Sequence, residues 1–227
     1  MTARLVSSVE IAPAVRHFVF EAVGVERLEF TPGQFVSFTA QVNGKEITRA
    51  YSLAAAPSGS NRFELCLNLV SDGHISPCLF AMQPGGTIAM RPPLGMFVLR
   101  HPEREALFIA TGTGIAPFRA MLQAHLTAGS PPITLLFGAR HHVLYRAEFE
   151  ELAHRIPQFR FWPTLSRPDP TWTGRSGHVQ VHLTEAIAGR RDVDVYLCGL
   201  KQMVDDVRSI LKEMGFDRKQ VSYEKYD

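Results

Sequence analysis

Short segments in the first hundred residues alternate between apolar and polar positions. Residues 34–42 and 62–70 both carry apolar side chains at every second position, such as Val36, Phe38 and Phe63. Such period-two patterns indicate strands that are buried on one face only. Turn-forming residues separate these segments at short intervals, as in the Pro-Gly pairs within residues 32–33 and 84–86. This half of the chain is predicted to form a small antiparallel Greek-key β-barrel.

Beyond residue 100 the pattern changes to continuous apolar runs separated by segments of helical periodicity. Such runs indicate strands buried on both faces, and their alternation with helices predicts an α/β doubly wound parallel sheet. The runs lie at residues 106–111, 133–139, 159–165, 193–199 and 221–226. We therefore expect two domains, a barrel over residues 1–100 and an α/β domain over residues 101–227.

Composition limits the possible classes of function. The 227 residues are 45% hydrophobic and 20% charged, and the formal net charge is +2. Because this charge is close to neutral and the basic residues form no long block, neither nucleic acid nor a membrane is an expected partner. No apolar run approaches the roughly 20 residues that span a bilayer, and the N-terminus lacks the pattern of an export signal. We expect a cytoplasmic protein.

The sequence gives no support for metal or disulfide chemistry. Cys66, Cys78 and Cys198 are too few and too widely spaced for a disulfide framework, a zinc site or an iron–sulfur cluster. His141 and His142 are adjacent, but no further ligand stands at a useful spacing. We expect three reduced thiols, two solvated histidines and no bound metal.

Glycines follow the first apolar run of the second half, where a parallel strand should turn into its helix. The run at residues 106–111 leads directly into Gly112, Thr113 and Gly114. At such a turn, helix N–H groups point towards a phosphate and glycine lets the backbone approach it closely. Two interpretations stay open from these residues alone, a dinucleotide-binding loop and a tight strand-to-helix connection.

Four separated motifs occur in the order and at distances similar to those of one protein family. They are RAYS at residues 49–52, GHIS at 73–76, GTGIAPFR at 112–119 and CGLKQM at 198–203. Together they resemble the ferredoxin–NADP reductase superfamily over nearly the whole chain. The resemblance implies a barrel that binds FAD and an α/β domain that binds a nicotinamide nucleotide, which agrees with the fold expected from the apolar pattern.

The first motif implies the flavin site. In this family the Arg of RxYS neutralises the FAD diphosphate, the Tyr stacks on the flavin ring and the Ser forms a hydrogen bond near flavin N5. These roles fall on Arg49, Tyr51 and Ser52. A guanidinium suits a diphosphate, and an aromatic ring excludes water from a planar cofactor. The alternative for these residues alone is a barrel strand with a buried Tyr and an exposed Arg.

The second motif implies contacts to the FAD phosphates. The family binds them through backbone N–H groups and a hydroxyl at the start of a short helix. The matching residues are Gly73, His74, Ile75 and Ser76. Without the resemblance, Ser76 would be interpreted only as a helix cap.

The C-terminal motifs imply the nicotinamide site. Cys198 and Gly199 match the family's CG pair at a strand end, and Glu224 matches the acidic residue of its C-terminal ExY motif. Tyr226 resembles the aromatic residue that covers the flavin. Ser52, Cys198 and Glu224 are therefore the expected catalytic residues. A buried Cys at a strand end also has an interpretation as core packing only.

The choice of nucleotide depends on the segment after residue 165. In relatives that use NADPH, a Ser-Arg pair at this point binds the 2′-phosphate. Ser166 and Arg167 match that pair, and Arg175 is a second candidate cation. We therefore expect NADPH, with NADH as the alternative.

The resemblance implies an oxidoreductase that passes electrons between NADPH and a one-electron carrier by hydride transfer at flavin N5. The carrier would be ferredoxin, flavodoxin or an oxygenase component on another polypeptide. One alternative is an NADH-dependent flavin reductase or oxygenase reductase component. Another belongs to a different class, a non-catalytic flavin-binding sensor or assembly subunit.

Overall fold

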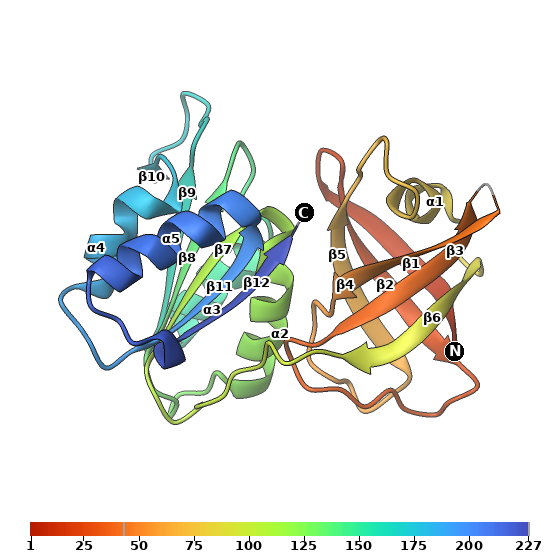
Figure 1. Cartoon of the computed structure of the whole chain (residues 1–227), viewed down its shortest axis with the longest axis horizontal. Helices are drawn as coiled ribbons and strands as arrows, with labels where there is room; N and C mark the ends of the chain where they lie inside the picture. The colour runs from red at the N-terminus through yellow and green to blue at the C-terminus, as the bar shows by residue number, and fades with distance from the viewer. Residues whose placement is uncertain (43, 227) are drawn as a thin grey trace. The chain divides into compact units, whose positions relative to one another are not determined.

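A computed structural model describes residues 1–42 and 44–226 (Figure 1). The chain divides into two compact units. Unit 1 comprises residues 1–98 and 116–124, and unit 2 comprises residues 99–115 and 125–227.

Unit 1 is an antiparallel six-stranded sheet with the strand order β4-β3-β6-β1-β2-β5. A bridge between Leu53 and Leu65 brings the end of β4 to β5, which closes the sheet into a barrel. The elements are β1 (Thr2–Ala12), β2 (Val15–Val23), β3 (Phe35–Val42), β4 (Lys45–Ser52), β5 (Arg62–Asn68), β6 (Thr87–Leu94) and the helices α1 (Ser76–Ala81) and α2 (Ala116–His125, of which His125 belongs to unit 2).

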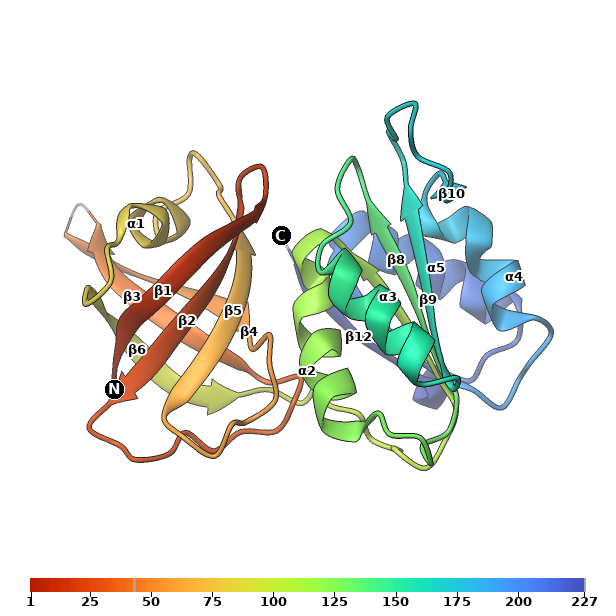
Figure 2. The same cartoon turned by 180° about the vertical axis from the view of Figure 1, so that it is seen from behind.

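Aromatic side chains fill the barrel because the period-two pattern turns alternate residues inward. Phe20 lies between Phe38 and Phe63, at ring-centroid distances of 5.2 Å and 5.7 Å, and all three are buried. Helix α1 covers one opening of the barrel, and Figure 2 shows it from the opposite side.

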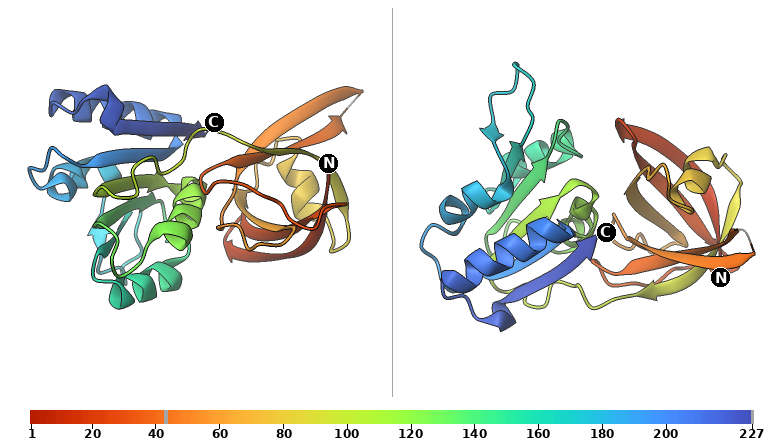
Figure 3. Two further views of the ribbon diagram at one scale, coloured as in Figure 1. Left: turned by 90° about the horizontal axis from the view of Figure 1, so that it is seen from below. Right: turned by 45° about the horizontal axis from the view of Figure 1, so that its top comes forward.

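Unit 2 is a parallel six-stranded sheet with the strand order β10-β9-β8-β7-β11-β12. Figure 3 shows this sheet with α5 on one face and α3 on the other, as a doubly wound fold requires. The elements are β7 (Ala106–Thr111), η1 (Gly112–Ile115), β8 (Ile133–Ala139), α3 (Arg146–Arg155), β9 (Phe159–Leu165), β10 (Arg175–Ser176), η2 (Val179–His182), α4 (Leu183–Ile187), β11 (Asp194–Leu200), α5 (Lys201–Glu213), η3 (Arg218–Gln220) and β12 (Val221–Tyr226).

The segment that enters unit 2 is fixed to its sheet. The buried Tyr196 hydroxyl accepts a hydrogen bond of 3.0 Å from the Arg100 backbone N–H. Burial raises the pKa of this tyrosine, so the hydroxyl stays protonated. Arg104 lies 3.5 Å from Asp194 and also pairs with Asp192. These contacts order the start of unit 2 before β7 begins.

Helix α2 packs within unit 1 although it follows β7 and η1 in sequence. Its Phe118 makes an edge-to-face contact with Phe97, with ring centroids 5.7 Å apart. Gly33 allows this packing, because a Cβ on it would lie 2.0 Å from the Phe97 carbonyl oxygen and 2.5 Å from the Met121 methyl group. A side chain at residue 33 would therefore force the barrel and α2 apart.

The predicted fold class is confirmed in both parts, an antiparallel barrel followed by a parallel α/β sheet. The boundary near residue 100 stays a prediction. Over residues 1–42 and 44–226, no helix has the length and apolarity needed to cross a membrane. The same residues contain no cluster of three or more potential metal-ligating side chains.

Candidate functional site

Strand β4 carries the three residues of the first motif at its C-terminal end. Arg49 is exposed and its guanidinium donates to the neighbouring Thr48 carbonyl at 2.9 Å. Tyr51 is half-buried and Ser52 is buried opposite Phe35 of β3. Because β4 ends at Ser52, the chain leaves the regular strand immediately after the motif. The structure thus groups these residues at one strand end.

Tyr51 lies at the edge of the barrel core. Its ring is 5.7 Å from the Phe38 ring and tilted by 47°. Burial raises its pKa to about 12, a rise opposed by the Arg49 charge and increased by Cys78 of α1. The phenol is therefore neutral at physiological pH and is close to both a cation and helix α1.

The second motif forms a tight loop that leads into α1. Gly73 donates its N–H to the Val70 carbonyl at 2.9 Å, and a Cβ on Gly73 would lie 3.0 Å from that oxygen. The buried Ser76 hydroxyl accepts from the Val70 N–H at 3.0 Å, so it also closes this loop. His74 is exposed, whereas Ile75 is buried at the helix N-cap position and offers no capping group. The first N–H groups of α1 thus lack a side-chain cap from Ile75.

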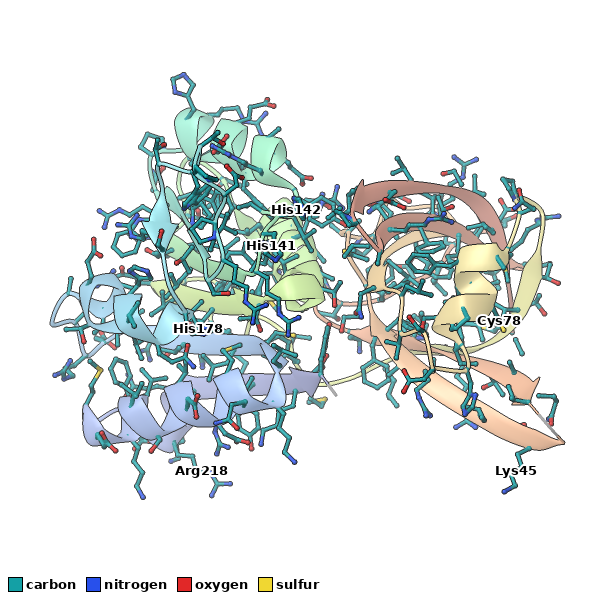
Figure 4. All side chains as sticks on the ribbon, turned by 90° about the horizontal axis from the view of Figure 1, so that it is seen from above. Lys45, Cys78, His141, His142, His178 and Arg218 are labelled. Carbon is teal, nitrogen blue, oxygen red and sulfur yellow. The ribbon has the colours of Figure 1, made fainter. Side chains whose placement is uncertain are left out.

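The other end of α1 is held by a residue that the sequence does not single out. The Arg16 guanidinium donates to the Phe80 carbonyl at 2.9 Å and lies 4.9 Å from the centre of the Phe80 ring. A cation at the C-terminal end of a helix offsets the partial negative charge of its last carbonyls. Figure 4 labels Cys78 on the same helix, where it is exposed.

In unit 2, the glycine turn after β7 contacts the turn after β11. A Cβ on Gly114 would lie 2.4 Å from the Cys198 carbonyl oxygen and 2.7 Å from Gly199 Cα. Gly112 and Gly199 have φ values of +54° and +139°, a region that favours glycine. Thr113 lies between the two loop glycines in η1 and is half-buried. The glycines of these turns therefore allow the two backbone segments to pack closely and also allow backbone conformations with positive φ.

A hydroxyl connects the same two turns. Thr111, the last residue of β7, accepts a hydrogen bond of 3.1 Å from the Leu200 N–H through its Oγ1. A Cβ on Gly199 would lie 2.2 Å from that oxygen. The sequence alone does not single out Thr111, because its role depends on which strand neighbours β7 in the sheet.

Cys198, Glu224 and Tyr226 meet where β11 and β12 lie side by side. Cys198 and Glu224 are register partners in the two parallel strands. The Cys198 thiol is completely buried, and its pKa is raised by burial first and by the Glu224 charge second. A hydrogen bond with the Tyr226 side chain opposes this rise. The thiol is therefore neutral at physiological pH and is no activated nucleophile.

Ser166 and Arg167 follow β9 and are held by the last residue of β8 and the residue after it. Their N–H groups donate to the carbonyls of Ala139 and Arg140, both at 2.9 Å. The His141 ring nitrogen Nδ1 lies 2.7 Å from the Arg167 carbonyl oxygen. Figure 4 labels His141 and the neighbouring His142 in this loop. Both histidines are exposed, but His141 orders the backbone of Arg167 rather than facing solvent alone.

Arg175 has partners of its own within unit 2. Its guanidinium carbon lies 3.9 Å from the centre of the Trp162 ring, and Nη2 lies 2.8 Å from Glu185 Oε1. The Trp172 indole N–H donates to the Arg175 backbone carbonyl at 2.8 Å. The charge of Arg175 is therefore partly balanced, whereas Arg167 exposes its side chain.

Two family models match the chain in the same order as the two folds. Residues 2–99 match the oxidoreductase FAD-binding domain, and residues 108–209 match the oxidoreductase NAD-binding domain. Ferredoxin–NADP reductase B of Sorangium cellulosum is 41% identical over 99% of this chain and 97% of its own length. The chain belongs to the ferredoxin–NADP reductase family. It is an oxidoreductase that uses FAD and a nicotinamide nucleotide, as the resemblance implied.

Other members of the family are longer than this chain. The anthranilate 1,2-dioxygenase electron transfer component of Acinetobacter baylyi is 32% identical over 89% of the chain, which spans 60% of that protein. A flavohemoprotein of a Burkholderia species is 35% identical over 89% of the chain, which spans 53% of it. This reductase thus resembles one part of each larger protein.

Solved structures of the family share the fold. A ferredoxin NADP+ reductase from Neisseria gonorrhoeae with bound FAD and NADP has a TM-score of 0.82 and 22% identity, and the match covers 99% of this chain and 98% of that one. An Amycolatopsis cytochrome P450 reductase has a TM-score of 0.87 and 26% identity, with 99% and 68% covered.

The residues present in the reductase fit both cofactors. In unit 1, an exposed guanidinium, a neutral phenol and the start of α1 offer a cation, an aromatic surface and N–H donors, which suit a flavin dinucleotide. In unit 2, the glycine turn lies at the carboxyl ends of the parallel strands, where nucleotides bind in such sheets. The roles of the individual residues stay predictions.

Proposed function

We propose that the reductase transfers electrons from NADPH through FAD to a one-electron carrier. The observation that carries this proposal is the group formed by Cys198, Glu224 and Tyr226 beside the glycine turn. A buried neutral thiol and a carboxylate at the carboxyl edge of a nucleotide-binding sheet suit the positioning of a nicotinamide ring. When bound, the nicotinamide supplies a hydride and the flavin accepts it and releases its electrons singly.

The barrel residues bind and orient in this proposal. Arg49 places a positive charge against the diphosphate, and the α1 start at Ile75–Ser76 adds backbone donors. Tyr51 covers the ring and excludes water. Ser52 donates its hydroxyl near the reacting nitrogen. Each of these roles requires a fixed side chain, which the β3 and β4 pairing supplies.

Replacing Arg49 by alanine will weaken FAD binding about tenfold to hundredfold. This range reflects the loss of one charge-assisted hydrogen bond to a phosphate. Fluorescence titration of the FAD-depleted protein with FAD measures the change. Arg62→Ala, which removes another exposed arginine of the barrel, is the control and should bind FAD normally. Equal affinities for all three proteins would contradict the role of Arg49.

Replacing Arg167 by alanine will reduce the preference for NADPH over NADH by raising the KM for NADPH about tenfold. Arg167 is exposed, and salt screens such a contact to a 2′-phosphate, so the loss should be larger at low ionic strength. Steady-state kcat/KM values for both nucleotides at two salt concentrations test this. Arg155→Ala, at the exposed end of α3, is the control. An unchanged ratio of kcat/KM values for Arg167→Ala would refute the assignment.

A second candidate function is that of an NADH-dependent flavin reductase or oxygenase reductase component. Arg175 favours this candidate, because Glu185 and Trp162 already engage its guanidinium. Only Arg167 of the proposed cation pair then presents an exposed side chain to a 2′-phosphate. Bleaching of the flavin by NADPH and by NADH, followed in parallel titrations, decides between the two nucleotides. Faster bleaching by NADH would favour this second function.

The carrier in the proposal is ferredoxin, flavodoxin or an oxygenase component. Names of relatives that include a ferredoxin–NADP reductase and a dioxygenase electron transfer component support this class. Reduction of purified ferredoxin and flavodoxin by the protein with NADPH tests it. If the flavin bleaches with neither nucleotide, the alternative of a non-catalytic flavin-binding subunit replaces the proposal.

A further inference from the structure

Two side chains of helix α2 form hydrogen bonds to the segment that follows Ser52. The Arg119 guanidinium donates to the Ala54 carbonyl at 2.7 Å. The Gln123 side-chain oxygen accepts from the Ala56 N–H at 3.0 Å. Side chains four residues apart lie on the same face of a helix, so both hydrogen bonds come from one face of α2. The segment 54–56 is thus attached to α2 at two points.

Arg119 is also part of an ion pair beneath this segment. Its Nη1 lies 2.8 Å from Glu64 Oε2 on β5, and the arginine side chain is only 13% exposed. His17 Nε2 lies 3.3 Å from the same carboxylate oxygen. A guanidinium removed from water to this extent is stable only with such partners, so its position is well defined.

Ala54 is held from both sides. Its N–H donates to the Glu64 carbonyl at 2.8 Å, and its own carbonyl accepts from Arg119. Between Ala54 and Ser52, Leu53 forms the bridge to Leu65. The end of β4 that carries Ser52 is therefore fixed by β5 and by α2 together.

Helix α2 also continues the glycine turn without interruption. The turn η1 ends at Ile115 and α2 begins at Ala116. A shift of α2 along its axis would displace the segment that follows Ser52, because Arg119 and Gln123 bind it.

We propose that Arg119 is a positioning residue for hydride transfer. This inference rests on the proposed function. It holds the segment after Ser52 on α2, so that the flavin-side hydroxyl of Ser52 keeps a fixed position within unit 1. Gln123 assists through the second bond. Arg119 itself contacts neither the substrate nor the cofactor in this role.

The test replaces Arg119 by glutamine in the purified, FAD-loaded protein. Stopped-flow reduction of the flavin at saturating NADPH should slow about tenfold, because small misplacements of reacting groups lower the rate steeply. The Kd values for FAD and NADPH should stay within about threefold of the native values. Hydrogen exchange at the Ala54 and Ala56 amides should accelerate, which provides a readout independent of turnover. Arg119→Lys should restore part of the rate.

Two further variants keep the test decisive. Glu64→Gln removes the charge of the partner, and its combination with Arg119→Gln should be no slower than Arg119→Gln alone if the two residues act as one unit. Arg146→Gln is the matched control, because Arg146 forms an exposed ion pair with Glu150 at 2.7 Å on α3. This control should reduce its flavin at the native rate.

Three results would overturn the inference. One is a native reduction rate in Arg119→Gln, and another is a loss of FAD affinity that accounts for the whole effect. The third, which applies if Arg119→Gln fails to fold, is a native rate in both Glu64→Gln and Gln123→Ala. Failure of the proposed function is distinguishable from all of these, since the native protein itself would then not be reduced by NADPH or NADH.

Discussion

Replacing Cys198 or Glu224 by alanine will slow reduction of the flavin by NADPH about a hundredfold while FAD remains bound. Both side chains lie in unit 2, on neighbouring strands, and neither belongs to the barrel motifs. If they orient the nicotinamide, their loss misplaces the reacting carbon, and a misplacement of about 1 Å can cost about a hundredfold in rate. Stopped-flow absorbance at saturating NADPH measures this step directly.

Two controls separate orientation from stability in this experiment. Cys66→Ala removes another buried thiol, on β5 of the barrel, and Glu213→Ala removes an exposed carboxylate at the end of α5. Both should reduce their flavin at the native rate. If Cys198 serves packing only, Cys198→Ala will lower the melting temperature and leave the rate in folded molecules unchanged.

Replacing Gly114 by alanine will lower kcat/KM for NADPH by a hundredfold or more. A Cβ at this position would lie 2.4 Å from the Cys198 carbonyl oxygen and 2.6 Å from its carbonyl carbon. Both are backbone atoms, so the contact cannot be relieved by a change of rotamer. The two turns would have to separate, which moves the proposed phosphate loop and the proposed nicotinamide site at once.

A second glycine provides the matched control for this substitution. A Cβ on Gly129 would meet no atom within 4 Å, and Gly129 has no positive φ. Gly129→Ala should therefore retain native kinetics and a native melting temperature. A Gly114→Ala protein with native kcat/KM would show that the contact between the turns is dispensable for nucleotide use.

The period of the apolar pattern was sufficient to predict both folds, because it reflects how many faces of a strand are covered. On β3, the alternating Val36 and Phe38 are fully buried, as expected. On β5, Cys66 is buried as well, although it faces the opposite side from Phe63 and Leu65. The outward face of β5 carries Glu64, which pairs with His17 and Arg119, so this face is only partly open to solvent.

The site residues were predictable only where a motif carried them. The joint motifs identified the residues that the structure groups at the end of β4 and at the carboxyl ends of β7 and β11. Thr111, Arg16 and the pairing of Arg175 with Glu185 depend on tertiary contacts between segments distant in sequence. A periodic pattern contains no information about such contacts, because it indicates which positions are buried and not which residue each side chain contacts.

The membership of α2 in unit 1 has a consequence for attempts to express the halves of this protein separately. A fragment cut at residue 98 would lose the helix whose Phe118 and Met121 pack against Phe97 and Gly33. The complementary fragment would keep that helix and present these two side chains, both fully buried in the whole chain, to water. Aggregation of one half and loosening of the other would follow. Chimaeras with other reductases should therefore transfer residues 116–124 together with the barrel.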